Sequence, residues 1–287
     1  MVGPGTTCLH RATFTCVRLD DMSNASDGLI ARVGGSWTRD KLTYLQRYAQ
    51  AFMTAMAPKR TEGRWQRLMF IDLLCGPGID VIEGDEHRGS PLLALATNPQ
   101  FDRLFFGDVE SGNIAALRQR IPPADLHRVD IAAGDCHERA RQVIAHFASW
   151  GDLAFAFVDP EGFEVRFEMF QTFGQCPIDI LFLFPSGIGI KRNLLQFARR
   201  TDETPMDTLW GNREWRQTPI ARLLAGEELT HQDAERLDQS WVQAFRERVA
   251  TAGYGYHDAA PPLRNPAGLQ IWRGIGRIEP GGQRRLW

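Results

Sequence analysis

Four short apolar runs, each ending in an acidic residue, constrain the fold of this chain more than any other feature. The carboxylates are spaced by 36, 27 and 24 residues (72 to 108, 108 to 135 and 135 to 159), about one βαβ unit each. In an open parallel sheet the carboxyl ends of the strands meet at one edge, and ligands bind there. The spacing therefore predicts that four carboxylates line one crevice: Asp72, Asp108, Asp135 and Asp159.

The segments around these runs alternate between helical and strand patterns. A helix is expected over 38–56, with Ser36 or Thr38 as its N-cap and Pro58 as its end. The alternation that follows predicts strands at 67–74, 103–108, 127–133, 153–158 and 178–184, and helices at 90–98, 111–120, 136–149 and 166–173. This order predicts an α/β fold with a Rossmann-like, doubly wound, mainly parallel sheet and a helical cap inserted after the fifth strand.

Local composition divides the chain into four segments. Residues 1–34 lack sustained periodicity, so we expect a poorly ordered leader that carries no chemistry. Residues 35–185 form the expected core. Residues 186–252 are mostly amphipathic and too long for an ordinary crossover, which predicts a helical cap over the crevice. Residues 253–287 are expected to complete the core in an atypical way, because only 269–272 has a strand pattern.

Charge and cysteine content exclude several classes of protein. The formal net charge of −2 leaves no global basic surface, so nucleic acid would need a local patch. None of the five cysteines forms a CxxC pair, which disfavours structural zinc and a disulfide framework. The sequence contains neither a signal-peptide core nor an apolar run long enough to span a membrane. We therefore expect a cytoplasmic protein without a membrane partner.

The first apolar run leads into a glycine turn. Glycine after a buried strand lets the backbone turn sharply and approach a ligand. Asp72, Cys75, Gly76 and Gly78 are therefore candidate cofactor-binding residues. The complete G-x-G-x-x-G motif is missing, which disfavours a nicotinamide cofactor. An ordinary strand-exit turn is the alternative interpretation.

A strong helix start follows the polar loop that is expected at 79–88. Ser90 is suited to the N-cap and Pro91 to the first helical position. The amides there could hold a carboxylate, which makes Ser90 a candidate cofactor-binding residue, although a simply capped helix fits equally well. His87 beside scattered acids is more typical of a solvated loop than of a metal site, so no metal is expected.

The next two acidic residues suit a nucleoside. An acid at the end of the second strand, here Asp108, commonly accepts hydrogen bonds from ribose hydroxyls. Asp135 could accept from an adenine amine while Cys136 packs near the ring. The alternative for Asp135 is a helix N-cap without any ligand.

The fourth acid lies in the most specific motif, Asp159-Pro160-Glu161-Gly162. Pro160 fixes φ and removes a donor, so the Asp159 carboxylate should project into the crevice as an acceptor. It could hold an amine or hydroxyl there and orient its lone pair. A plain Asp-Pro turn is the alternative. Phe184 at the end of the fifth strand, with Arg192 and Asn193 after it, completes the candidate substrate site, although such polar pairs are usually only solvated.

A ligand with hydroxyls, an exocyclic amine and a positive centre suits this row of acceptors, and S-adenosylmethionine has all three. The chain also resembles the three-Cys-motif partner family (TcmP) in an ordered set of segments: 37–48, 71–78, 89–92, 134–136, 158–162 and 192–193. The resemblance covers roughly residues 36 to 200. It implies a class I S-adenosylmethionine-dependent methyltransferase fold and a partner protein with a three-Cys motif. Beyond about residue 255 the apolar last strands of such a fold are weak.

These observations predict an S-adenosylmethionine-dependent methyltransferase. Asp159 would position the methyl acceptor, and Glu161 would neutralise or deprotonate it. Asp-Pro-x-Gly is also similar to the element of guanine-N2 tRNA methyltransferases. Nucleic acid is the favoured substrate because cations gather in the expected cap: Lys191, Arg192, Arg199, Arg200, Arg213, Arg216 and Arg222. Two alternatives stay open: a non-catalytic partner module of a defence or modification system, and a small-molecule methyltransferase.

Overall fold

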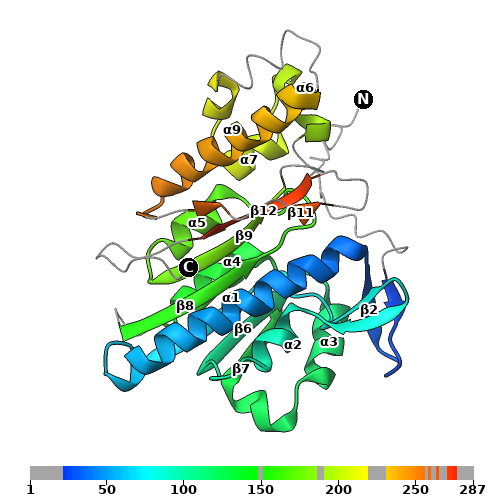
Figure 1. The fold of residues 1–287 in the computed structure, drawn as a ribbon, viewed down its shortest axis with the longest axis vertical. Helices are drawn as coiled ribbons and strands as arrows, with labels where there is room; N and C mark the ends of the chain where they lie inside the picture. The colour runs from blue at the N-terminus through cyan, green and yellow to red at the C-terminus, as the bar shows by residue number, and fades with distance from the viewer. Residues whose placement is uncertain are drawn as a thin grey trace, which may run out of the picture.

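The fold is taken from a computed structural model, which describes residues 22–147, 151–185, 191–218, 231–255, 258–259, 263–264 and 270–276 (Figure 1). The predictions for residues 1–21, 148–150, 186–190, 219–230, 256–257, 260–262, 265–269 and 277–287 lie outside these ranges.

A large, mainly parallel sheet forms the centre of the molecule. Its parallel strands are β3 (Arg67–Asp72), β6 (Arg103–Asp108), β7 (Val129–Ala133), β8 (Asp152–Val158) and β9 (Ile178–Phe184). β12 (Gln270–Gly276) runs antiparallel beside β9, and β10 (Asp258–Ala259) and β11 (Leu263–Arg264) pair with β12. The strand order is β10-β12-β9-β8-β3-β6-β7. The Rossmann-like, doubly wound sheet predicted from the sequence is confirmed.

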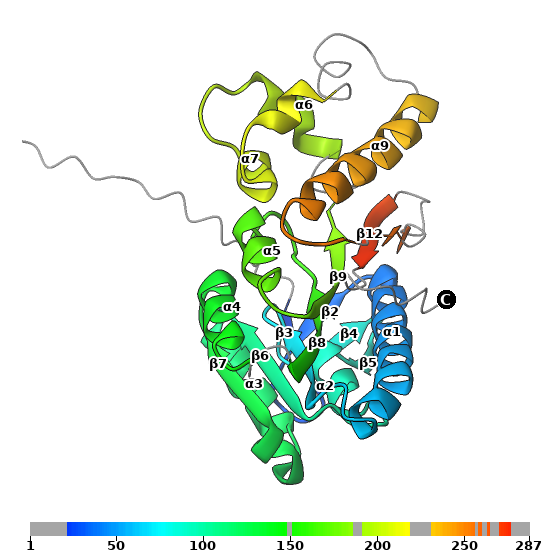
Figure 2. The ribbon, with the colours of Figure 1, turned by 90° about the vertical axis from the view of Figure 1, so that its left-hand side faces the viewer.

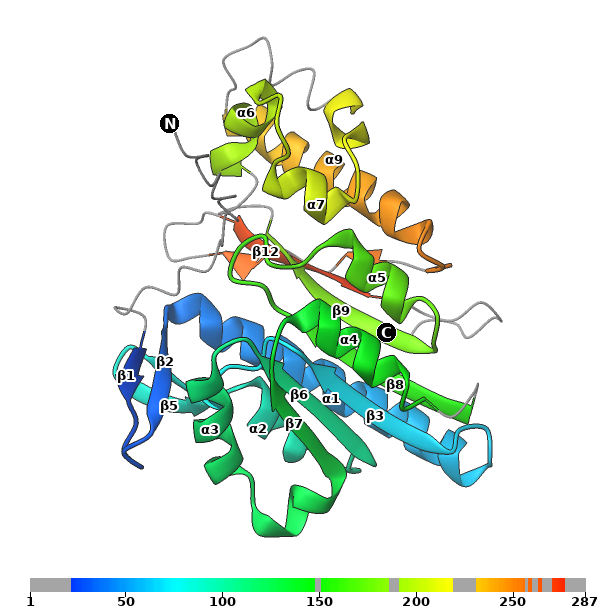
Figure 3. The ribbon, with the colours of Figure 1, turned by 180° about the vertical axis from the view of Figure 1, so that it is seen from behind.

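Helices cover both faces of this sheet. They are α1 (Ser36–Thr61), α2 (Ser90–Leu95), α3 (Ser111–Arg120), the 3-10 helix η2 (Pro123–Arg128), α4 (Cys136–Ile144) and α5 (Phe167–Phe173). Alternate residues of β3 divide between two cores, with Phe70 packed in the core of α1 and α2, and Ile71 in that of α4 and α5. Figures 2 and 3 show α1 and α4 on opposite sides of the sheet. Burial on both faces explains why these strands are continuous apolar runs.

The first helix is longer than predicted. It begins after Gly35, which is the N-cap in place of Ser36 or Thr38, and it continues through Pro58 to Thr61. The predicted end at Pro58 is wrong. Proline removes one N–H, which would have bound the carbonyl of Thr54, and Thr54 is exposed, so water can serve that carbonyl. Among the described residues, no helix is both long enough and apolar enough to cross a bilayer.

A second, four-stranded sheet was not predicted. It consists of β1 (Met22–Asn24), β2 (Ile30–Gly34), β4 (Ile79–Ile82) and β5 (Asp85–Arg88), in the order β1-β2-β4-β5. The prediction of a poorly ordered leader is therefore wrong for residues 22–34. The segment 79–88, which was expected to be a loop, is a β-hairpin. Glu83 and Gly84, both with positive φ, form its two-residue turn. Parallel pairing of β2 with β4 joins segments that are far apart in the sequence.

Arg120 at the end of α3 fixes the small sheet to the large one. Its buried guanidinium binds the Asp27 carboxylate at 2.8 and 2.9 Å and donates to the carbonyls of Ile30 and Pro77 at 2.8 and 2.7 Å. One side chain therefore connects the start of β2 with the glycine turn after β3.

The segment after β9 is helical, as predicted. It contains α6 (Lys191–Arg199), α7 (Pro205–Trp210), the 3-10 helix η5 (Glu214–Gln217) and α9 (His231–Ala250). Side chains of α7, η5 and α9, including the fully buried Trp215, continue the core that contains α4 and α5. α6 reaches the loop after β8, where the rings of Phe197 and Phe163 lie 5.5 Å apart. The cap therefore extends one face of the sheet and contacts the Asp159 loop.

Candidate active site

The carboxyl ends of the central strands bring three of the four predicted acids together. Asp72 ends β3, Asp108 ends β6, and Asp159 follows β8, and the negative charges of Asp159 and Asp108 both act on Asp72. All three side chains are buried, with 0, 9 and 6% of each residue exposed. The predicted row of carboxylates is therefore present at this edge.

Asp72 is the most buried of these acids. Burial raises its pKa to about 7, although the nearby Ser90 side chain and the Leu74 amide act in the opposite direction. Its Oδ1 accepts from Leu74 N at 3.2 Å, and its buried Oδ2 has no hydrogen-bond partner among the residues that the structure describes. An orphaned carboxylate oxygen of this kind is costly unless a ligand supplies a donor.

The raised pKa of Asp72 predicts a pH dependence of stability in the ligand-free protein. An unfolded aspartate has a pKa near 4, so between about pH 4 and 7 the folded state binds the extra proton. The free energy of unfolding should therefore fall as pH rises through this window, by roughly 1 kcal/mol per pH unit. Urea unfolding of the wild type and Asp72→Asn at several pH values isolates this contribution. Parallel pH profiles for the two proteins would contradict it.

The glycine turn after β3 forms a close backbone cradle. Gly76 and Gly78 both have positive φ, at 63° and 92°, and a Cβ on Gly78 would lie only 2.8 Å from Leu117 Cδ1. The Gly76 amide donates to Asp108 Oδ2 at 2.9 Å, so the cradle is fixed to the end of β6. Cys75 is buried within this turn. The requirement for glycine that the sequence indicated is therefore real at both positions.

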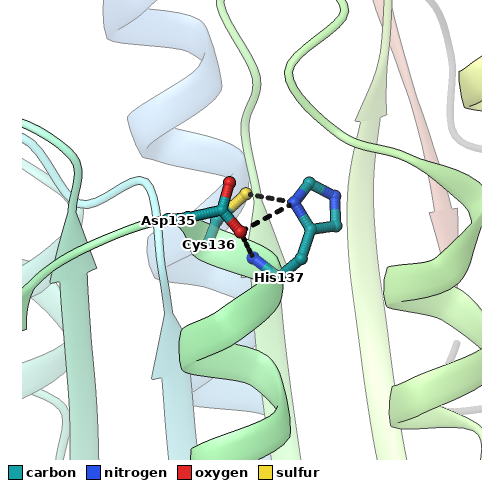
Figure 4. A group of neighbouring side chains, drawn as sticks. All are labelled: Asp135, Cys136 and His137. Carbon is teal, nitrogen blue, oxygen red and sulfur yellow. Dashed lines mark hydrogen bonds and ion pairs between the residues drawn. The ribbon is translucent and has the colours of Figure 1, made fainter.

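Asp135, Cys136 and His137 form a compact cluster at the start of α4 (Figure 4). Asp135 Oδ1 accepts the amides of His137 and Glu138, both at 3.0 Å, so this carboxylate is the helix N-cap. His137 Nε2 accepts the amide of Arg166 at 2.9 Å, which places the ring proton of a neutral histidine on Nδ1. A metal at Nδ1 would need the lone pair that this tautomer lacks. Burial raises the pKa of Cys136 to about 12, so its thiol remains protonated.

Asp159 has a partner that the sequence analysis missed. The Lys41 ammonium on α1 donates to Asp159 Oδ2 at 2.6 Å, and both side chains are buried, at 8 and 7% exposure. The sequence does contain a signal, because Lys41 interrupts the apolar stripe that Leu45, Tyr48 and Phe52 continue. A charged residue on the buried face of a helix needs a partner in the core.

A second ion pair borders the first. Arg32 on β2 binds Glu161 at 2.9 Å, with the two side chains 20 and 49% exposed. Burial acts to lower the pKa of Arg32, but the charges of Glu161, Asp159 and Asp80 raise it. Asp80 faces Arg32 across the small sheet, and its own pKa is raised by burial. The segment expected to carry no chemistry therefore supplies a cation to the site.

Other predicted site residues lie elsewhere. Phe184 is fully buried and its ring lies 4.7 Å from that of Phe245, so it belongs to the core and has no surface for a substrate. Pro160, which follows Asp159, is buried. Asn193 lies half-buried on α6, and the Arg192 side chain is outside the described part of the structure. A strand-end position alone did not determine which way Phe184 points.

Three cations of the expected basic patch have partners within the cap, but only Arg216 turns inward. Arg216 donates to Asp207 and to the carbonyls of Ala198 and Arg200, and it stacks on Trp215. Arg200 pairs with Asp202, and Arg213 donates to the carbonyl of Thr201. Arg199 is exposed, whereas the side chains of Lys191, Arg192 and Arg222 lie outside the described residues.

Comparison with known proteins gives a limited result. No family model and no curated protein match the sequence. Among solved structures, the chain resembles magnesium protoporphyrin IX methyltransferase from Synechocystis PCC 6803 with bound SAH (11% identity; 82% of this chain and 83% of that one; TM-score 0.37). It also resembles protein LPL1258 from Legionella pneumophila (11%; 83% and 86%; TM-score 0.47). A third neighbour, EvdMO1, matches with 11% identity over 81% of this chain and 40% of its own length (TM-score 0.40). At these values the fold assignment rests on the strand order of the chain itself.

Proposed function

We propose that this protein is an S-adenosylmethionine-dependent methyltransferase. The observation that carries the proposal is the meeting of Asp72, Asp108 and the Gly76–Gly78 cradle at the carboxyl edge of a doubly wound sheet. The residues fit this cofactor. The orphaned Asp72 Oδ2 offers an acceptor to a positively charged amine, and a backbone without Cβ atoms admits close approach of a ligand.

Each cofactor group has a candidate partner in this chain. We assign Asp108, at the end of β6, to the ribose hydroxyls. Val109 directly after it is 54% exposed and offers an apolar surface to the adenine ring. We assign the N-cap Asp135 and Cys136 to the adenine, and Ser90, which acts on Asp72, to the methionine end. Val109 was missed because a single exposed valine has no distinctive pattern.

The bound cofactor would supply an electrophilic methyl group, and the chain's own residues would orient the acceptor. Asp159 lies at the end of β8, one strand beyond the cofactor positions on β3 and β6. Its carboxylate can take a hydrogen bond from the group that is methylated. Lys41 keeps that carboxylate in place. Glu161, bound to Arg32, is half-exposed beside it. Orientation of this kind accelerates transfer without a covalent enzyme intermediate.

Asp108→Ala should weaken S-adenosylmethionine binding by about ten- to a hundred-fold, because two ribose hydroxyls lose a charged acceptor. The variant also frees the amides of Gly76 and Glu110, which Asp108 accepts at 2.9 and 2.8 Å. Asp125→Ala is a matched control at a distance from the cradle, since this carboxylate pairs with Arg128. Calorimetry measures both. Unchanged affinity for Asp108→Ala would remove Asp108 from the cofactor site.

The substrate is open to three interpretations. Nucleic acid and membership of the three-Cys-motif partner type remain proposals from the sequence motifs. The inward-facing Arg216 and the paired Arg200 reduce the charge available to a nucleic acid and favour a small acceptor as the second candidate. A non-catalytic partner module is the third. Incubation with labelled cofactor and separate tRNA, DNA, protein and metabolite fractions distinguishes them, because each predicts label in a different fraction or in none.

A further inference from the structure

The Lys41–Asp159 ion pair is almost completely buried. Its atoms are 2.6 Å apart, and each side chain is less than a tenth exposed. Removing two charges from water usually costs about as much as their attraction returns, so such a pair is poor evidence for a stabilising role. It lies among further charges, because Asp80 is within the electrostatic reach of Lys41, Arg32 and Asp159. The arrangement therefore calls for a chemical explanation.

The position of the pair places it at the methyl acceptor. Under the proposed function, on which this inference rests, the cofactor is held at the ends of β3 and β6 and at the start of α4. Asp159 directly follows the neighbouring strand β8, and Lys41 reaches it from the second turn of α1. The half-exposed Glu161, bound to Arg32, borders the pair. An acceptor that parts Glu161 from Arg32 would reach Asp159 and Lys41 together.

The two partners make opposite demands on an acceptor. The lysine ammonium only donates hydrogen bonds, whereas the ionised carboxylate only accepts them. A hydroxyl satisfies both groups and keeps a second lone pair for the methyl group. An aromatic amine offers protons to Asp159, but its single lone pair cannot serve Lys41 and the methyl group at once.

We propose that Lys41 and Asp159 together receive a hydroxyl group, so that the enzyme methylates oxygen. In this step the carbon–sulfur bond of the cofactor breaks and a carbon–oxygen bond forms with an electron pair of the hydroxyl. The hydroxyl proton passes to Asp159 and then to water. The cofactor leaves as the neutral thioether, and Lys41 keeps its three protons while it donates to the reacting oxygen. Both side chains are therefore catalytic residues.

The chemical nature of the product tests this inference. The full-length protein is incubated with S-adenosylmethionine carrying a deuterated methyl group and an extract containing nucleic acids, proteins and metabolites. Mass spectrometry then identifies the labelled atom. Label on oxygen supports the proposal. Label on nitrogen, carbon or sulfur overturns it and leaves the methyltransferase proposal intact. Cofactor binding without any labelled product also overturns it, and failure to bind the cofactor overturns the proposed function itself.

Variants of Lys41 test its role on the identified product. Lys41→Met should lower kcat by about a hundred-fold or more, while the cofactor Kd stays within a few fold. Lys41→Arg retains the charge and the donors, so it should fold. Its kcat should be at least about tenfold higher than that of Lys41→Met. Lys59→Met, at the far end of the same helix, should match the wild type. If Lys41→Met does not fold, Lys41→Arg decides: a kcat unchanged from the wild type together with a weakened cofactor Kd would overturn the acceptor role.

Discussion

Asp159→Asn is expected to reduce methyl transfer by about a hundred-fold or more, while the affinity for S-adenosylmethionine changes by no more than a few fold. The proposed cofactor positions lie on other strands, whereas Asp159, directly after β8, is the proposed partner of the methyl acceptor. Asparagine keeps the shape of the side chain but cannot take the acceptor's proton. Calorimetry gives the cofactor Kd, and release of labelled product gives the turnover.

Two further variants separate catalysis from stability. Asp159→Asn leaves Lys41 without its anion, so the stability of the variant should fall. Replacing both partners, as Lys41→Met with Asp159→Leu, should restore stability without activity, because apolar residues of similar volume replace buried ion pairs well. Glu168→Gln, on an exposed ion pair of α5, is the matched control and should keep full turnover.

A strong loss of cofactor affinity in Asp159→Asn would assign Asp159 to the cofactor. If the wild type methylates nothing and Asp159→Asn affects only partner binding, the partner-module alternative stands.

Asp207→Ala is expected to lower the free energy of unfolding by about 3–5 kcal/mol. This carboxylate, 4% exposed, accepts from Trp215 Nε1 at 2.6 Å, from Thr204 N at 2.8 Å and from Arg216 Nη2 at 3.1 Å. Burial acts to raise the pKa of Asp207, but these hydrogen bonds outweigh it and hold the pKa below its usual value. Removing the carboxylate leaves a buried indole N–H and a partly buried guanidinium without their acceptor. Urea unfolding monitored by tryptophan fluorescence measures the change.

Asp202→Ala provides the comparison for Asp207. Asp202 lies five residues earlier in the same cap segment, and it pairs with Arg200 at the surface. Exposed pairs contribute little to stability, so this variant should unfold at the same urea concentration as the wild type. Equal midpoints for the Asp207 and Asp202 variants would mean that the network around Asp207 does not hold the cap.

Segments with a clear hydrophobic pattern were predictable from the sequence. The predicted bounds 103–108, 111–120 and 178–184 agree with β6, α3 and β9. Strands buried on both faces and a helix between turn residues carry strong local signals. The meeting of Asp72, Asp108 and Asp159 followed as well, because parallel strands share one carboxyl edge.

Features that depend on distant contacts were not predictable. β2 is stabilised by pairing with β4, about 50 residues later in the chain, and its own sequence shows no clear alternation. The sequence therefore did not predict that Arg32 lies at the candidate site. Side-chain direction caused two further errors: Phe184 turns into the core, and Arg216 turns inward to Asp207. Neither direction can be derived from spacing, because packing of the cap determines both.

Titration of the wild-type protein with S-adenosylmethionine in a calorimeter tests the central claim most directly. We expect one binding site with micromolar affinity, and affinity should increase with pH through about 7 as Asp72 loses its proton and meets the positive cofactor. Absence of binding heat with S-adenosylmethionine across this pH range, together with clear binding of NAD, would contradict the account.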